Sequence, residues 1–205
     1  MKRCLFLLAI LAASLVHSPT GSAGNEKPNG TKVAIDPERS MIGFVAGSFG
    51  FGTVTGQFHE ISGWIDLPTA APTSLTATAT IGVHSIDTGW GLRDRVLKGK
   101  NFFDADDYPR MHFEALAVTQ RQDTLTMTGR FGLHGVTNTL TFPFTLSPTN
   151  AAASDRPPTI RATFELNRQD YGVGSDTFKD RLVDDMITIR LRLTGKPPRS
   201  EAPNP

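Results

Sequence analysis

Regular alternation of apolar and polar side chains is the feature that most constrains the fold of this chain. Five segments alternate in this way, and most of their polar positions are Thr. They are residues 75–83, 125–133, 140–146, 160–166 and 187–193. Successive side chains of a strand point to opposite faces, so each segment has one apolar and one polar face. The pattern predicts half-buried antiparallel strands.

Four less regular segments also favour strands: residues 32–36, 41–46, 53–67 and 110–119. The stretch 87–107 breaks the pattern and predicts a short helix over 90–98. Asp87 or Thr88 would cap this helix and Gly99 would end it. The sequence therefore predicts an all-β protein of roughly eight antiparallel strands with one short helical segment.

Roughly eight strands with one apolar face can form a sandwich or a closed barrel, and closure removes exposed sheet edges. A barrel of eight strands can be filled by side chains or can hold one small ligand. Large Phe side chains alternate with small residues at positions expected to face inward. These small residues are Ala77, Ala79, Ala115, Ala117, Gly129 and Ala162. The composition by itself favours a solid core but is also compatible with a tunnel.

The first residues have the three parts of a secretory signal peptide. Lys2 and Arg3 precede the apolar run 4–16, and small residues lead to an expected cleavage after Ala23. We therefore expect a signal peptide over 1–23, a flexible leader over 24–31, one domain over 32–195 and a disordered tail over 196–205. The apolar run is shorter than the ~20 residues of a membrane span.

Charge and cysteine content exclude several classes of site. The formal net charge is +1, which gives no reason to expect a nucleic acid partner. The single cysteine, Cys4, lies in the expected signal peptide, so the mature chain would have no disulfide. The histidines after that segment have no ligand spacing typical of a metal site, so no metal is expected.

A series of short motifs resembles the YceI-like family of periplasmic polyisoprenoid-binding proteins. The resemblance covers residues 33–194 and lies in the order and spacing of the motifs. They include Ser85-Ile86-Asp87-Thr88, Arg93-Asp94, Phe102-Phe103-Asp104, Tyr108-Pro109, His134-Gly135-Val136-Thr137, Asn167-Arg168 and Tyr171-Gly172. The chain departs from the family at Arg39 and Ser48, where His is frequent, and at Tyr171, where Phe is common.

The resemblance implies a lipocalin-like antiparallel barrel with an interior tunnel for an isoprenoid chain. With it we favour a tunnel over a solid core and expect an exported, periplasmic lipid-binding protein without catalytic activity. A long-chain isoprenoid or quinone-like lipid is the expected partner, and no cofactor is expected. Dimers through the outer faces are compatible with a closed barrel.

The expected tunnel lining combines aromatic and aliphatic residues of the predicted strands and helix. It consists of Phe44, Phe58, Ile65, Ala79, Ile81, Leu97, Phe102, Phe103, Phe113, Phe131, Leu133, Phe142, Phe144 and Phe164. Arg93, Asp94 and Arg168 are candidates for the tunnel mouth and a polar head group. The alternative for Arg93 and Asp94 is that they pair within the protein and tie the helix to the barrel, or lie in water. The alternative for Arg168 is that it holds a turn.

Two other functions are compatible with the sequence. A structural or interaction module would have a filled barrel and would act through its outer faces. An enzyme acting on an isoprenoid or quinone would need a base, a nucleophile or a metal in the lumen. The apolar inner faces argue against the enzyme.

Overall fold

The computed structural model describes residues 30–48, 52–148, 156–174 and 183–197. The expected signal peptide lies outside these residues, as do most of the expected leader and tail. Gly30 and Thr31, expected in the leader, already belong to the first strand. No helix among the described residues is long and apolar enough to cross a membrane.

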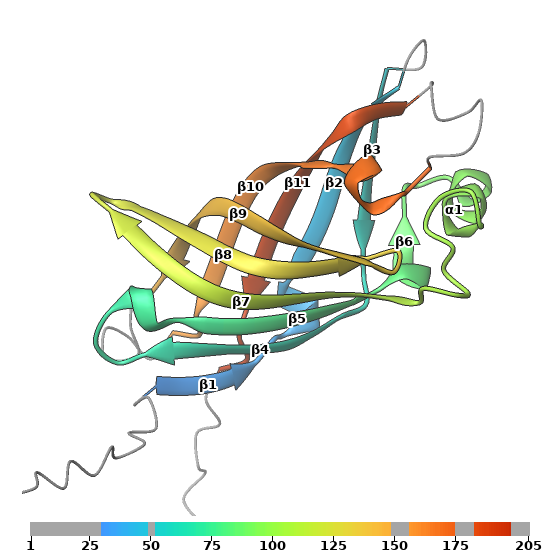
Figure 1. Ribbon diagram of the computed structural model, residues 1–205. Coiled ribbons are helices and arrows are strands. Elements are labelled where there is room, and N and C mark those ends of the chain that lie inside the picture. Colours follow the sequence, from blue (N-terminus) through green and yellow to red (C-terminus); the bar gives the residue numbers. More distant parts are fainter. Residues whose placement is uncertain (1–29, 49–51, 149–155, 175–182, 198–205) are drawn as a thin grey trace, which may run out of the picture.

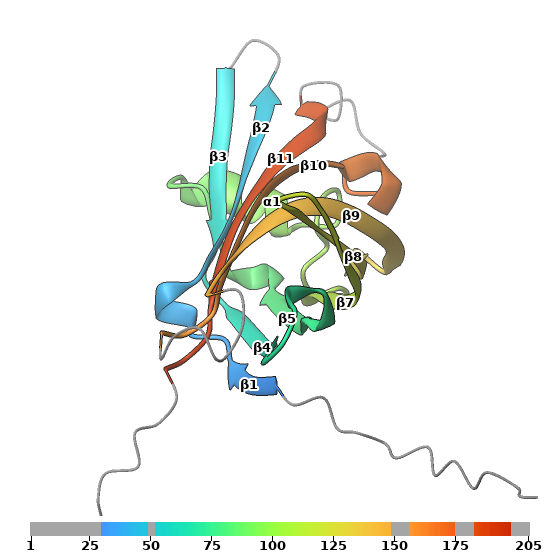
Figure 2. The same cartoon turned by 90° about the vertical axis from the view of Figure 1, so that its left-hand side faces the viewer.

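One antiparallel sheet of eleven strands forms the described part of the chain and curls into a half-barrel (Figures 1 and 2). The order in the sheet is β1-β4-β5-β7-β8-β9-β10-β11-β2-β3-β6. The strands are β1 (Gly30–Ala34), β2 (Met41–Ser48), β3 (Gly52–Phe58), β4 (Ile61–Pro68), β5 (Thr76–Gly82), β6 (Ile86–Asp87), β7 (Arg110–Arg121), β8 (Thr124–Leu133), β9 (Val136–Ser147), β10 (Thr159–Asn167) and β11 (Val183–Thr194). The helix α1 (Gly91–Lys98) lies at one end of the barrel (Figure 1).

The all-β barrel with one short helix is confirmed, but the expected strand number is too low. Residues 53–67, expected as one strand, form two strands joined by a turn: β3 pairs with β2 and β6, and β4 pairs with β1 and β5. The backbone N–H groups of His59 and Glu60 both donate to the Ser85 Oγ, at 3.1 and 2.9 Å, and this contact from a distant segment holds the turn. The two-residue strand β6 was not predicted.

The expected helix caps at Asp87 and Thr88 are wrong. Trp90 occupies the N-cap of α1 without a side-chain bond, whereas Gly99 is the C-cap as expected. The Asp87 Oδ1 accepts from the Gly89 N–H at 2.8 Å, and this bond is the main reason that the Asp87 pKa lies below its usual value. Asp87 therefore shapes the turn before the helix.

A β-bulge in β7 changes which side chains face inward. Pairing between β7 and β8 shifts between Ala115 and Ala117, so Leu116 has no cross-strand partner in this register. Ala117, expected to face inward, is exposed, and Val118 is buried in its place. The inner face thus follows one alternation before the bulge and the opposite one after it.

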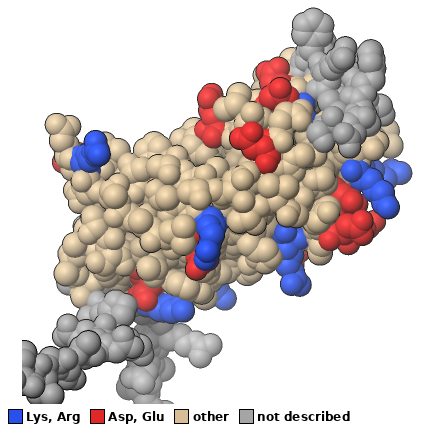
Figure 3. Space-filling model, viewed as in Figure 1, with Lys and Arg blue, Asp and Glu red and all other residues tan. Residues whose placement is uncertain are grey.

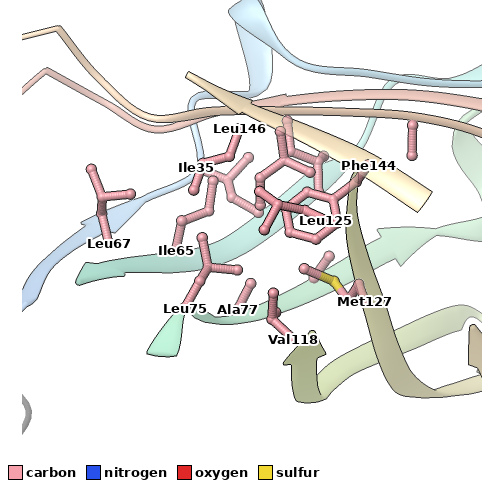
Figure 4. Close-up of a cluster of buried hydrophobic side chains, with 14 of the residues drawn as sticks. Ile35, Ile65, Leu67, Leu75, Ala77, Val118, Leu125, Met127, Phe144 and Leu146 are labelled. Carbon is pink, nitrogen blue, oxygen red and sulfur yellow. The ribbon is translucent and has the colours of Figure 1, made fainter. Parts of the chain in front are cut away.

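Large aliphatic and aromatic side chains fill the barrel at the end away from α1. We call this cluster the packed end; its members are Ile35, Ile65, Leu67, Leu75, Val118, Leu125, Phe144 and Leu146, and Figure 4 shows them converging. Backbone bonds close the curl beside them. The Asp36 N–H donates to the Thr194 carbonyl at 2.8 Å, and the Lys196 N–H to the Ala34 carbonyl at 2.7 Å. These bonds join the β1 edge of the sheet to the end of β11.

Candidate ligand-binding site

An apolar cavity of about 300 Å³ occupies the remainder of the barrel interior, from its middle to the α1 end. We call this region the hollow end. Nearly all of its lining residues are aliphatic, aromatic or Gly. Among the described residues, the polar or charged ones in the lining are Thr78, Arg93 and Arg168. Such a surface offers an apolar ligand contacts on all sides but few hydrogen bonds.

Small residues of several strands leave the space that the aromatic rings do not fill. Ala46, Ala77 and Ala79 line the cavity together with Gly43 and Gly47. Facing them are rings that contact one another. Phe142 stacks on Phe164 at 4.3 Å between ring centroids, Phe113 lies 5.8 Å from Phe142, and Phe58 lies 5.9 Å from Phe103 and 6.0 Å from Phe44.

Two glycines make room for these rings. A Cβ atom at Gly56 would collide with the ring of Phe44, its cross-strand partner in β2. A Cβ atom at Gly129 would collide with the ring of Phe113 on the neighbouring strand β7. The glycines of β3 and β8 therefore determine how far the aromatic side chains extend over the sheet.

The structure brings all but two of the predicted lining residues to the cavity. Those at the cavity are Phe44, Phe58, Ala79, Ile81, Leu97, Phe102, Phe103, Phe113, Phe131, Leu133, Phe142 and Phe164. Ile65 and Phe144 lie instead in the packed end, where they contact other core side chains and not the cavity. Their strands point the expected face inward, but the interior is already full at their level.

Sequence reasoning left out one wall of the cavity. Ile187, Ile189, Leu191 and Leu193 of β11 all line it. Their alternation with polar residues had already assigned them to the apolar face of a strand. The missing information was the position of β11 in the sheet, between β10 and β2, which no local pattern indicates.

Arg93 lies at the α1 end of the cavity and is half-buried. Its Nε donates to the Thr88 Oγ1 and its Nη2 to the Thr88 carbonyl, both at 2.8 Å, and the guanidinium lies 5.7 Å from the centre of the Trp90 ring. No described residue accepts a hydrogen bond from its Nη1. One donor nitrogen is therefore available to a polar group at the cavity.

The side chains of Asp94 and Arg168 form hydrogen bonds that connect segments of the protein. The Asp94 Oδ1 accepts from the N–H and the hydroxyl of Thr88, at 2.9 and 2.6 Å, and Asp94 is absent from the lining. Asp94 and Arg93 thus tie α1 to the preceding turn at Thr88.

Arg168 lines the cavity, but its guanidinium donates to protein groups. Among the described residues, the acceptors are the carbonyls of Val173, Gly174, Val183 and Asp184 and the Asp185 carboxylate, at 2.7–3.1 Å. These five bonds match the five N–H donors of an arginine. Its side chain joins the 3-10 helix Arg168–Tyr171 to the beginning of β11.

Comparison with known proteins agrees with this architecture. The YceI-like domain profile matches residues 34–195, which is most of the chain and all but four residues of its barrel. The chain belongs to the YceI-like family. Among curated relatives, a UPF0312 protein of Shewanella putrefaciens is 28% identical over 143 residues, covering 68% of this chain and 71% of the relative. Protein YceI of Shigella flexneri is 27% identical over 175 residues, covering 83% and 87%.

Solved structures share the fold of this YceI-like chain. The crystal structure of BcnA from Burkholderia cenocepacia is similar with a TM-score of 0.71 and 25% identity, covering 79% of this chain and 99% of BcnA. A polyisoprenoid binding domain from Saccharophagus degradans, implicated in plant cell wall breakdown, has a TM-score of 0.64 and 16% identity, covering 80% and 98%. At 16% identity the second likeness concerns the fold alone.

Proposed function

We propose that this YceI-like protein binds a long apolar lipid, a polyisoprenoid or a quinone with an isoprenoid tail, in the hollow end and does not alter it chemically. The observation that carries the proposal is the cavity of about 300 Å³ whose polar lining is limited to Thr78, Arg93 and Arg168 among the described residues. The protein from Saccharophagus degradans that shares this fold is a polyisoprenoid binding domain, which supports the same ligand class.

Burial of apolar area supplies the affinity. An isoprenoid tail has no hydrogen-bonding group, and each Å² removed from water contributes about 25 cal/mol before the ordering of protein and ligand is subtracted. Half-buried Phe164 and Leu191 line the cavity and would lose their remaining exposure to a bound chain. The Arg93 Nη1 would donate to the oxygen of a head group at the α1 end.

The cavity size limits how much of the lipid lies inside. An apolar cavity of about 150 Å³ holds one benzene molecule. The hollow end, at about 300 Å³, thus takes only a few isoprene units in its present form. A longer chain would project from the α1 end or displace lining side chains.

The character of the lining supports binding without catalysis. An enzyme needs a base, a nucleophile or a metal at the reacting atoms. Of the cavity's three polar or charged residues, Arg168 is fully hydrogen-bonded within the protein and Arg93 is bonded to Thr88. In the described ranges, no three His, Cys, Asp or Glu side chains are grouped to hold a metal ion. Export to the periplasm is part of the proposal and rests on the signal-peptide pattern of residues 1–23.

Native mass spectrometry of protein purified without detergent tests the proposal. We expect a long-chain apolar species to leave the protein on activation. The companion variant Ala79→Trp fills the cavity, and we expect it to reduce uptake of a radiolabelled prenyl alcohol by about tenfold while the fold is kept. Ala70→Trp places the same side chain on an exposed loop and should leave uptake unchanged. Equal uptake by both variants would contradict binding in the hollow end.

A further inference from the structure

Apolar side chains are exposed on and beside α1. Trp90, Leu92 and Val96 are exposed to 58, 56 and 48%. Leu92 and Val96 are four residues apart and therefore neighbours on one face of the helix. The other large apolar side chains that are exposed in the described ranges are Met41, Tyr108, Leu116, Val136 and Met186, which come from five different segments of the chain. We call Trp90, Leu92 and Val96 the exposed ridge.

The exposed ridge is continuous with the cavity. Val96 belongs to the ridge and also lines the cavity, together with Arg93 and Leu97 of the same helix. A Cβ atom at Gly89 or Gly91, which flank Trp90, would meet only open space. Val96, exposed and part of the lining, thus connects the apolar surface of α1 with the cavity at this end of the barrel.

Basic side chains flank the ridge. At 100° per residue Arg95, three residues after Leu92, borders the ridge, Lys98 lies farther round α1, and Lys100 follows the helix. Acidic side chains also occur at this end of the molecule, as Figure 3 shows. Asp94 is bonded to Thr88, and Asp106 pairs with His84 at 3.5 Å. The edge of α1 itself carries apolar and positively charged side chains.

We propose that α1 docks on the surface of a lipid bilayer. The exposed ridge would enter the boundary between head groups and acyl chains, and Arg95, Lys98 and Lys100 would contact anionic head groups, as in interfacial amphipathic helices. The inference rests on the proposed function, because a long apolar lipid resides in a bilayer and not in water. A cavity mouth on the bilayer lets it transfer without crossing water. Because the ridge is short, the docking is weak and reversible, which suits a carrier that must leave the bilayer again.

Tryptophan fluorescence tests the docking at the helix itself. The chain has two Trp residues, Trp64 and Trp90, so the full-length Trp64→Phe variant reports on position 90 alone. With vesicles of phosphatidylcholine and phosphatidylglycerol that contain no isoprenoid, we expect its emission to shift to the blue. Lipids brominated on the acyl chain should quench it. Trp90→Phe, which retains only Trp64, should show neither change.

A second substitution in the Trp64→Phe background separates ridge docking from other contacts. Leu92→Gln should weaken the vesicle-induced change by about threefold or more, because it removes an apolar side chain from the interface. Leu116→Gln changes a similarly exposed Leu of β7, 51% accessible against 56% for Leu92, and should have no effect. An unshifted Trp90 emission, or equal effects of the two substitutions, would overturn the docking inference.

Uptake of the prenyl alcohol in vesicle-free solution distinguishes the two proposals. Leu92 is not in the cavity lining, so Leu92→Gln should bind the alcohol as the parent protein does. Normal uptake without vesicle docking would refute the docking alone. Vesicle docking without any uptake would refute the proposed lipid cargo and leave the membrane contact standing.

Discussion

The packed end and the hollow end belong to one barrel and are built from the same types of residue. They differ in the sizes of the side chains that face one another across the interior. At the packed end, β1, β4, β5 and the β7–β8 hairpin bring large side chains such as Ile65, Leu75 and Leu125 together (Figure 4). Toward the hollow end, Ala79 of β5 and Ala46 of β2 occupy inward positions, and space is left between the rings. An alternating sequence therefore specifies an apolar interior, and the sizes of facing residues decide whether it is full.

Matched isoleucine truncations should separate the two ends most clearly. Ile65 is fully buried in the packed end, so Ile65→Ala should lower the free energy of unfolding by about 2–5 kcal/mol through lost contacts and a new cavity. Ile189 lines the existing cavity and is only half-buried, so Ile189→Ala should cost about 1 kcal/mol. Denaturant unfolding measures both. Equal losses would mean that the hollow end is as tightly packed as the other.

A polar contact adds to the apolar packing around the hollow end. Arg168→Met should lower the free energy of unfolding by about 2–3 kcal/mol, because it removes charged hydrogen bonds and leaves buried carbonyls such as that of Val173 without their donor. Arg168→Lys should retain only part of this free energy, since one ammonium group cannot reach all the acceptors. If Arg168→Met unfolds at the same denaturant midpoint as the original protein, this side chain contributes little to the stability of the hollow end.

Near neutral pH, the smallest effect is expected at Tyr171, which is 1% exposed beside Phe131. Its hydroxyl has no hydrogen-bond partner among the described residues, and the nearby Asn138 amide donates to the Asp170 carbonyl. Near neutral pH, Tyr171→Phe should be neutral or raise the free energy of unfolding by about 1 kcal/mol. Denaturant unfolding at pH 7 measures the difference, and a clear loss of stability would show that the hydroxyl is bonded after all.

The same tyrosine predicts a pH dependence. Burial raises the pKa of Tyr171 to about 12, compared with about 10 in an unfolded chain. Between these values the unfolded state loses a proton that the folded state retains, so stability should fall as the pH rises from 10 to 12. Tyr171→Phe should remove this loss, on the order of 2 kcal/mol at pH 12. An identical alkaline decline in both proteins would contradict the buried, protonated hydroxyl.

Local alternation predicts most of the strands and most of the cavity lining. Inward positions such as Phe142 and Phe164 follow from period two once a strand is recognised. The family resemblance, and not the composition, favoured a tunnel, because large and small residues occur in both ends of the barrel. Ile65 and Phe144 illustrate the limit: their inward direction was predictable, but their level along the barrel was not.

The remaining errors have causes that lie far away in the sequence. The turn at His59 and Glu60 is held by Ser85, and the bulge at Leu116 appears only in the pairing of β7 with β8. Arg168 looks like a residue for a head group until its acceptors near the beginning of β11 are in place. Each of these three features depends on a contact between distant segments, which the periodicity of a single strand cannot indicate.

Methyl NMR during titration with a prenyl alcohol is the most direct test of the division into a hollow and a packed end. We predict that the methyl signals of Ile81, Leu133 and Leu191, which line the cavity, shift on binding. Those of Ile65, Leu75 and Leu125 in the packed end should stay in place. Shifts confined to the packed end or to the outer face at Leu116, or no shifts at all, would contradict a lipid held in the hollow end.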